Sequence, residues 1–271
     1  TILTQLLNPA PAPILNGASV NLEITSVVDY AGNPLMEPYP WRFTADVPTV
    51  SSEDLRQITS TGGDSPALSP SGEYVVFLTP VEGGSRLMVA PTDNPQDARP
   101  VDTAGLAVSD PTWSPEGSQL AYLTGSGAQM ELVLAPVTAD GSVGEGRVAL
   151  TGTNLASPSW SPDGTRIALI REGNVVTLAV DGSTPPEVVT QDPERPYRSV
   201  AWSPVGQKLA LGFNLYERRV EVLDLTTRNL QSITQGGEAT DPVWLNGTTL
   251  LYTAPSGPGL PAAIWQVNAD G

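Results

Sequence analysis

The sequence predicts an all-β protein made of repeated units, and three observations support this class. A short phrase containing Ser-Pro-x-Gly recurs along the chain. Segments that alternate apolar and polar residues follow each copy, as expected for half-buried strands. The 271 residues include 26 glycines and 27 prolines, which supply the turns between short strands. No segment keeps the 3.6-residue apolar period of a helix, so we expect no helix longer than two turns.

The recurring phrase is clearest at residues 159–164, Ser-Trp-Ser-Pro-Asp-Gly. Its five copies are aligned on the anchor residues Leu68, Trp113, Trp160, Trp202 and Trp244, which are separated by 45, 47, 42 and 42 positions. A period in the forties is typical of radial or stacked repeat proteins. Such regular spacing predicts that the anchors pack between repeats rather than stack against a ligand. We expect Trp41 and Trp265 to be buried as well.

Each repeat reads as four short strands. In the third copy these are residues 156–161, 165–171, 175–180 and 187–190, separated by turns that contain Pro-Asp-Gly, Gly-Asn and Asp-Gly. The other copies follow the same template. Four antiparallel strands in about 42–47 residues describe one blade of a β-propeller. The sequence therefore predicts a propeller of five four-stranded blades.

Residues 160–168, with the pattern W-S-P-D-G-x-x-I-A, resemble the WD-like repeat of TolB-type propellers. The resemblance covers residues 55–271 and implies the fold. It implies no single function, because such propellers occur as periplasmic interaction proteins, as lids on serine peptidases and as modules of surface proteins.

The closure of the ring has two interpretations. Leu55–Thr59 resembles the fourth strand at Leu230–Thr234, and the fifth repeat reaches Asp270 where its own fourth strand is due. In the first interpretation, residues 55–59 pair with residues 262–267 and complete a five-bladed ring, which removes exposed strand edges. In the second, the chain is part of a larger propeller.

The first 48 residues differ from the repeats. Residues 24–35, with the turn D-x-A-G-N-P-L, and residues 39–44 resemble the last strands of a bacterial Ig-like domain. We predict a partial Ig-like segment at 1–48, a linker at 49–54 and the propeller at 55–271. We also expect the chain to be part of a longer multidomain protein or assembly.

Composition excludes several functions. The net charge of −16 and the single lysine, Lys208, argue against binding to nucleic acid or anionic membranes. The chain has no Cys and no His, so it cannot by itself form a disulfide, a thiolate zinc site or a Ser-His-Asp triad. No stretch of about 18 apolar residues is present, so the sequence predicts no transmembrane helix. We therefore predict no catalytic residues and no cofactor.

Polar residues precede each anchor. The third residue before each anchor is Ser or Asp in all five repeats: Ser65, Asp110, Ser157, Ser199 and Asp241. In the first repeat Asp64 comes one residue earlier. In a propeller these positions lie at the start of the strand that lines the central channel. Asp64, Asp110 and Asp241 are therefore candidate metal ligands, because hard oxygen donors suit Ca²⁺. The alternative is that Asp and Ser before Pro only cap turns.

These observations predict a non-catalytic scaffold for protein–protein interaction or structural display. The resemblance implies a periplasmic or cell-surface protein of a bacterium. One alternative is the propeller of a prolyl-oligopeptidase-like serine peptidase whose catalytic domain is absent from this chain. Another is a cell-wall or carbohydrate-binding adhesin module, which only the Ig-like segment supports.

Overall fold

The computed structural model describes residues 19–24, 39–44, 62–191, 196–213, 219–234, 239–255 and 261–270. The chain divides into two compact units, Thr1–Gln57 and Ile58–Gly271. In the first unit, β1 (Ser19–Ile24) pairs antiparallel with β2 (Tyr39–Thr44), from Ser19 opposite Thr44 to Ile24 opposite Tyr39. The predicted strand at residues 39–44 is therefore present, while residues 25–35 lie outside the described part of the chain.

The second unit contains five antiparallel sheets, or blades, in chain order. Blade 1 comprises β3 (Asp64–Leu68), β4 (Tyr74–Val81), β5 (Gly84–Pro91) and β6 (Arg99–Pro100). Blade 2 comprises β7 (Val108–Trp113), β8 (Gln119–Ser126), β9 (Gln129–Pro136) and β10 (Arg147–Gly152). Blade 3 comprises β11 (Leu155–Trp160), β12 (Arg166–Arg171), β13 (Asn174–Ala179) and β14 (Glu187–Val188).

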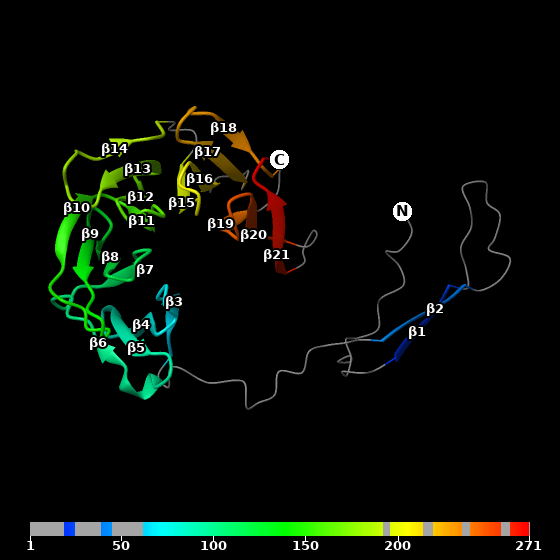
Figure 1. Cartoon of the computed structure of the whole chain (residues 1–271), viewed down its shortest axis with the longest axis horizontal. Helices are drawn as coiled ribbons and strands as arrows, with labels where there is room; N and C mark the ends of the chain where they lie inside the picture. Colours follow the sequence, from blue (N-terminus) through cyan, green and yellow to red (C-terminus); the bar gives the residue numbers. More distant parts are fainter. Residues whose placement is uncertain are drawn as a thin grey trace. The chain divides into compact units, whose positions relative to one another are not determined.

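Blade 4 comprises β15 (Tyr197–Trp202), β16 (Lys208–Phe213), β17 (Val220–Asp224) and β18 (Leu230–Ser232). Blade 5 comprises β19 (Thr240–Trp244), β20 (Thr249–Pro255) and β21 (Ala262–Asn268). Figure 1 shows the blades following one another along an arc, with the first strand of each blade on the inner side. Within the described ranges the one helix is η1 (Pro95–Asp97), a single 3₁₀ turn. The all-β propeller prediction is confirmed.

The fifth blade has three strands among the described residues, and β21 pairs there with β20 alone. Leu55–Thr59, the segment expected to complete this blade, lies outside the described residues. The closure of the ring by this segment therefore stays a prediction.

The Ser-Pro-x-Gly phrase forms the turn between the first two strands of a blade. In blade 3 the Ser161 hydroxyl accepts a hydrogen bond from the Arg166 amide at 2.9 Å, and the Gly164 amide donates to the Ser161 carbonyl at 2.9 Å. Gly164 has φ +70°, a conformation that a side chain disfavours. The same turn recurs at Ser69, Ser114 and Ser203, so the motif is local turn chemistry.

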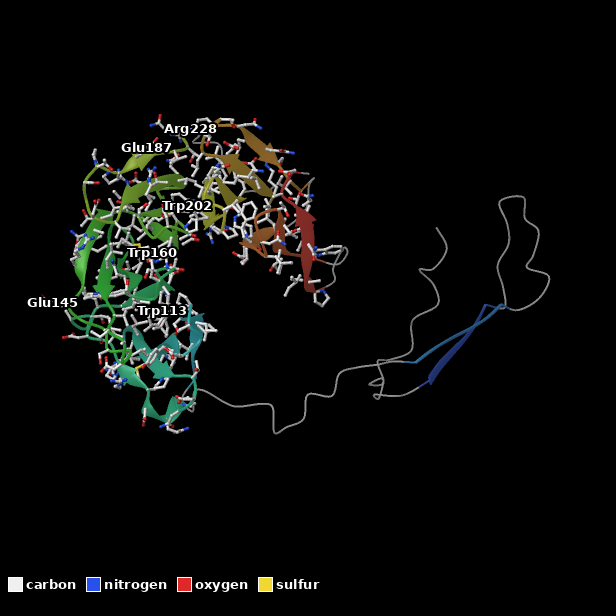
Figure 2. All side chains as sticks on the ribbon, viewed as in Figure 1. Trp113, Glu145, Trp160, Glu187, Trp202 and Arg228 are labelled. Atoms are coloured by element: carbon white, nitrogen blue, oxygen red, sulfur yellow. The ribbon has the colours of Figure 1, made fainter. Side chains whose placement is uncertain are left out.

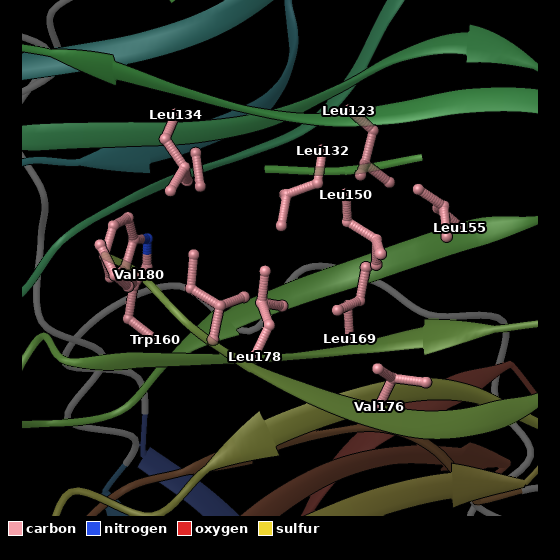
Figure 3. Close-up of a cluster of buried hydrophobic side chains, with 12 residues drawn as sticks. Leu123, Leu132, Leu134, Leu150, Leu155, Trp160, Leu169, Val176, Leu178 and Val180 are labelled. Carbon is pink, nitrogen blue, oxygen red and sulfur yellow. The ribbon is translucent and has the colours of Figure 1, made fainter. Parts of the chain in front are cut away.

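The core lies between neighbouring blades. Figure 3 shows Leu132, Leu134 and Leu150 of blade 2 facing Leu169 and Leu178 of blade 3. Trp160 belongs to this cluster, and Trp113 and Trp202 are buried in the equivalent clusters on either side. Each blade therefore covers one face of the next.

The anchors at the two ends of the repeat series differ from those in the middle. Leu68 in blade 1 is 61% exposed, and Trp244 in blade 5 is half-buried. The expected burial of Trp265 is wrong, because its side chain is 41% exposed on β21, the last described strand of the last blade. Apolar residues at repeat positions are buried only where a neighbouring blade covers them.

Polar contacts join the blades at their outer sides. Glu187 of blade 3 accepts from the Arg228 guanidinium of blade 4 at 2.5 Å, and Lys208 of blade 4 donates to Asp270 after β21 at 2.6 Å. Arg147 of blade 2 donates to the Val180 carbonyl of blade 3. Figure 2 shows Glu187 and Arg228 together on the outer side of the arc, away from the tryptophan anchors. These exposed pairs add little stability individually, so the packed faces remain the main source of cohesion.

Candidate functional site

The polar residues before the anchors lie in an unusual backbone conformation. Ser65, Asp110, Ser157 and Asp241 have φ between 48° and 53°, in the left-handed region. Each is followed by a proline, and the pairing register of the inner strand shifts at this point. A non-glycine residue in this region is uncommon and strained, so its recurrence in four blades marks a specific feature of the inner strands.

Blade 4 departs from this pattern. Ser199 is followed by Val200, whose backbone carries the N–H that a proline lacks. That N–H donates to the Ser157 hydroxyl of blade 3 at 3.1 Å, and the Trp202 amide donates to the Ser159 hydroxyl at 2.9 Å. The serines of blade 3 therefore bind the inner strand of blade 4, a structural role that their position in the sequence did not reveal.

The candidate metal ligands Asp64, Asp110 and Asp241 are exposed and lie on the inner strands of three different blades. Among the described residues, no three of His, Cys, Asp and Glu are close enough together to hold a metal ion. The proposed Ca²⁺ site therefore stays a prediction from the sequence alone.

Blade 4 contains a buried polar network that the sequence interpretation missed. The Glu221 side chain is 2% exposed, and its carboxylate is 2.9 Å from the Arg219 guanidinium nitrogen Nε. The Tyr197 hydroxyl donates to the other carboxylate oxygen at 2.7 Å. The Arg219 guanidinium also lies over the Phe213 ring, 5.3 Å from its centre. A glutamate among the apolar residues of V-E-V-L, at positions 220–223, was the available signal.

Two cavities of about 540 and 500 Å³ lie against blade 2 on the side of blade 1. Both are lined by Leu106, Thr124 and Glu131, and we call them together the blade 1–2 groove. A third cavity, of about 870 Å³, lies between blades 2 and 3 and carries both signs of charge, with Arg147 and Arg166 opposed by Glu145 and Asp181. Figure 2 shows Glu145 on the outer side of the arc.

No helix among the described residues is long and apolar enough to cross a membrane. The comparison with curated proteins gave no match. Among solved structures, a putative TolB from Agrobacterium tumefaciens superposes with a TM-score of 0.64 at 18% identity, over 79% of this chain and 79% of that chain. TolB from Acinetobacter baumannii superposes with a TM-score of 0.61 at 14% identity, over 90% of this chain and 59% of that chain.

A puromycin-hydrolyzing peptidase of Mycobacterium tuberculosis superposes with a TM-score of 0.62 at 22% identity, over 76% of this chain and only 36% of the peptidase. At these identities the likeness is one of fold. Residues 52–195 match the family model described as the lipoprotein LpqB β-propeller domain. Because this match spans more than half of the 271 residues, the chain belongs to the lipoprotein LpqB β-propeller domain family.

Proposed function

We propose that the second unit is a non-catalytic scaffold that binds a protein partner at the end of the propeller where the inner strands begin. The observation that carries this proposal is the recurrence of strained Ser and Asp residues at equivalent positions of four blades. Three of these side chains, Ser65, Asp110 and Asp241, are exposed. Strained backbone is retained where it presents groups for function, and exposed polar groups on a rigid frame suit recognition.

The proposed setting is the periplasm or the cell surface. Support comes from the family description, which names a lipoprotein, and from the fold shared with TolB proteins. The Ig-like interpretation of the first 48 residues fits the same setting, because such modules extend surface proteins.

Site-specific photo-crosslinking tests the partner-binding end. A photo-reactive amino acid replaces Asp110 or Asp241 in the full-length protein, and the adducts formed in cells of its native host are compared. Control positions are Glu116 and Asp93, which are exposed and lie in turns away from the inner-strand starts. We expect one discrete adduct from Asp110 and Asp241 and none from the controls. Equal labelling from all four positions, or no adduct at all, would contradict the proposal.

A second function is favoured by the structural likeness to the mycobacterial peptidase. In that case the chain is the propeller of a peptidase whose catalytic domain lies in another part of the protein. The two proposals differ in the rest of the open reading frame, where a G-x-S-x-G turn and a histidine would indicate a hydrolase domain. In both, this chain alone gives no hydrolysis of a generic peptide substrate. Turnover abolished by one substitution within the chain would contradict both.

A further inference from the structure

The blade 1–2 groove exists because two facing blades have outer strands of different length. The outer strand of blade 1, β6, has two residues, whereas β10 of blade 2 has six. Blade 2 therefore extends beyond the part of its face that blade 1 covers. The segment from Asp102 to Leu106 crosses this uncovered part, and the Ala104 amide donates to the Asp102 carboxylate at 2.9 Å.

Two hydroxyl side chains on β8 face this groove. Tyr122 is 2% exposed and Thr124 is 3% exposed, and they lie two residues apart on the face that packs toward blade 1. The Thr124 hydroxyl is buried and has no hydrogen-bond partner among the residues that the structure describes. For Tyr122, burial and the nearby charge of Asp102 raise the pKa of the phenol, so it stays protonated. A buried hydroxyl without a partner is unfavourable, which suggests that a partner is supplied from outside the chain.

The repeat itself does not require hydroxyls at these positions. Leu169 in blade 3 and Leu211 in blade 4 occupy the position equivalent to Tyr122, and both are fully buried. The positions equivalent to Thr124 hold Arg171 and Phe213. Blade 1 has Phe77 and Thr79 at the two positions, and blade 5 has Tyr252 and Ala254. Either hydroxyl therefore recurs in another blade, and blade 2 is the blade that combines the two.

The backbone at Gly146 packs closely against the Tyr122 hydroxyl. A Cβ atom at position 146 would lie 2.9 Å from the Tyr122 hydroxyl oxygen and closer still to Val133. Gly146 lines the groove together with Gly144, and even a methyl group at position 146 would have no room beside the hydroxyl. The phenol is therefore packed against this backbone and forms part of the groove floor.

The charge of the residues that line the groove indicates which kind of ligand it would bind. Asp102, Glu131 and Glu145 line it, and the described residues of its lining include no Lys or Arg. Its walls are also apolar, with Leu106 and Val148 partly exposed to solvent. The complementary group is a cation on an apolar stem. Arginine fits best, because its planar guanidinium carries several donors for carboxylate and hydroxyl oxygens and its methylene stem covers apolar surface.

We propose that the blade 1–2 groove binds an arginine-bearing peptide segment, whose guanidinium donates to the carboxylates of Glu131 and Asp102 and to the Thr124 hydroxyl oxygen. This inference goes beyond the partner-binding end proposed above and does not depend on it. The groove is lined by β8, β9 and β10 of blade 2 and does not include Asp110, so crosslinking at Asp110 can succeed while peptide binding fails, and the reverse.

Fluorescence anisotropy with the purified full chain tests the proposal. The probe is a fluorescein-labelled octapeptide of alternating arginine and leucine, and the reference is the same peptide with glutamate in place of arginine. The double variant Asp102→Asn/Glu131→Gln should weaken binding of the arginine peptide at least about tenfold, as expected for loss of charge-assisted hydrogen bonds. The matched control is Asp93→Asn/Glu116→Gln, which removes the same net charge from exposed sites elsewhere and should change affinity less than about twofold.

Thr124→Val is the second variant, because it keeps the shape of the side chain and removes only the hydroxyl. It should weaken the arginine peptide about three- to tenfold without lowering the melting temperature. Equal losses in both double variants would show that diffuse negative charge attracts the peptide, and would overturn the site. Unchanged affinity in Thr124→Val, or equal binding of the glutamate peptide, would overturn it as well.

Discussion

Two interfaces built from the same repeat differ in whether their buried polar groups are paired. One lies between blades 1 and 2, and the other lies between blades 3 and 4. Between blades 3 and 4 the outer strands β14 and β18 are similarly short, and the buried Glu221 is paired with Arg219 and Tyr197. Between blades 1 and 2 the outer strands are unequal, and the buried Thr124 hydroxyl has no partner in the described part of the chain. The same repeat therefore pairs its buried polar groups at one interface and leaves a buried hydroxyl unpaired at another.

The largest expected loss of stability concerns the apolar interface between blades 2 and 3, where apolar side chains of each blade are buried against the other. Trp160→Ala should lower the free energy of unfolding by about 3–5 kcal/mol, because a buried aromatic ring is removed and a cavity remains. Urea unfolding followed by fluorescence measures this loss. The control Trp265→Ala removes a ring that is 41% exposed and should cost about 1 kcal/mol or less. Similar losses in both variants would contradict the importance of coverage by a neighbouring blade.

A smaller effect is expected in the paired interface between blades 3 and 4. Glu221→Gln keeps the shape of the side chain but removes the charge that pairs with Arg219, and should destabilise the protein by about 1.5–3 kcal/mol. Urea unfolding again provides the measurement, with Glu131→Gln in the open groove as the control. The control should be close to neutral, since Glu131 is half-buried beside a cavity. If the two variants behave alike, the contrast between the interfaces is wrong.

For the Thr124 hydroxyl in the groove, we expect its removal to change the free energy of unfolding in the opposite direction. Thr124→Val should leave stability unchanged or raise it by up to about 1 kcal/mol, because an unpaired buried hydroxyl is replaced by an apolar group of the same shape. Thermal unfolding of the ligand-free protein checks this. A loss greater than about 1 kcal/mol would indicate that the hydroxyl has a structural partner.

The smallest effect is a pH dependence at the outer contact between blades 3 and 4. Hydrogen bonds from Arg228 and then Arg166 hold the pKa of Glu187 below its usual 4.5. Because the folded-state pKa is the lower one, its stabilising contribution is present above about pH 4.5 and is lost as the pH falls through the lowered value. The pair is exposed, so the contribution is about 0.2–1 kcal/mol.

Melting temperatures of the native protein and Glu187→Gln, measured from about pH 7 to about pH 3, should differ slightly at neutral pH and converge in acid. A difference that persists or grows at low pH would contradict the assigned pairing.

Local signals in the sequence predicted most of the propeller. The turn at Ser161–Gly164 follows from hydrogen bonds within a few residues, and the strands after it are apolar runs of six to eight residues bounded by turns. The burial of Trp113, Trp160 and Trp202 followed from the repeat period. The same reasoning was wrong for Trp265, because burial at this position depends on a neighbouring blade and not on its own repeat.

The sequence by itself determined the turns, the strands and the number of repeats, since each of these depends on residues close together along the chain. The tertiary structure decided which polar groups meet. The Glu221 carboxylate accepts a hydrogen bond from Tyr197 of another strand, and the Ser157 hydroxyl accepts one from Val200 in the next blade. The groove at Thr124 exists because two outer strands, 47 residues apart in the sequence, differ in length. Such contacts join distant positions through packing, and no local pattern in the sequence encodes them.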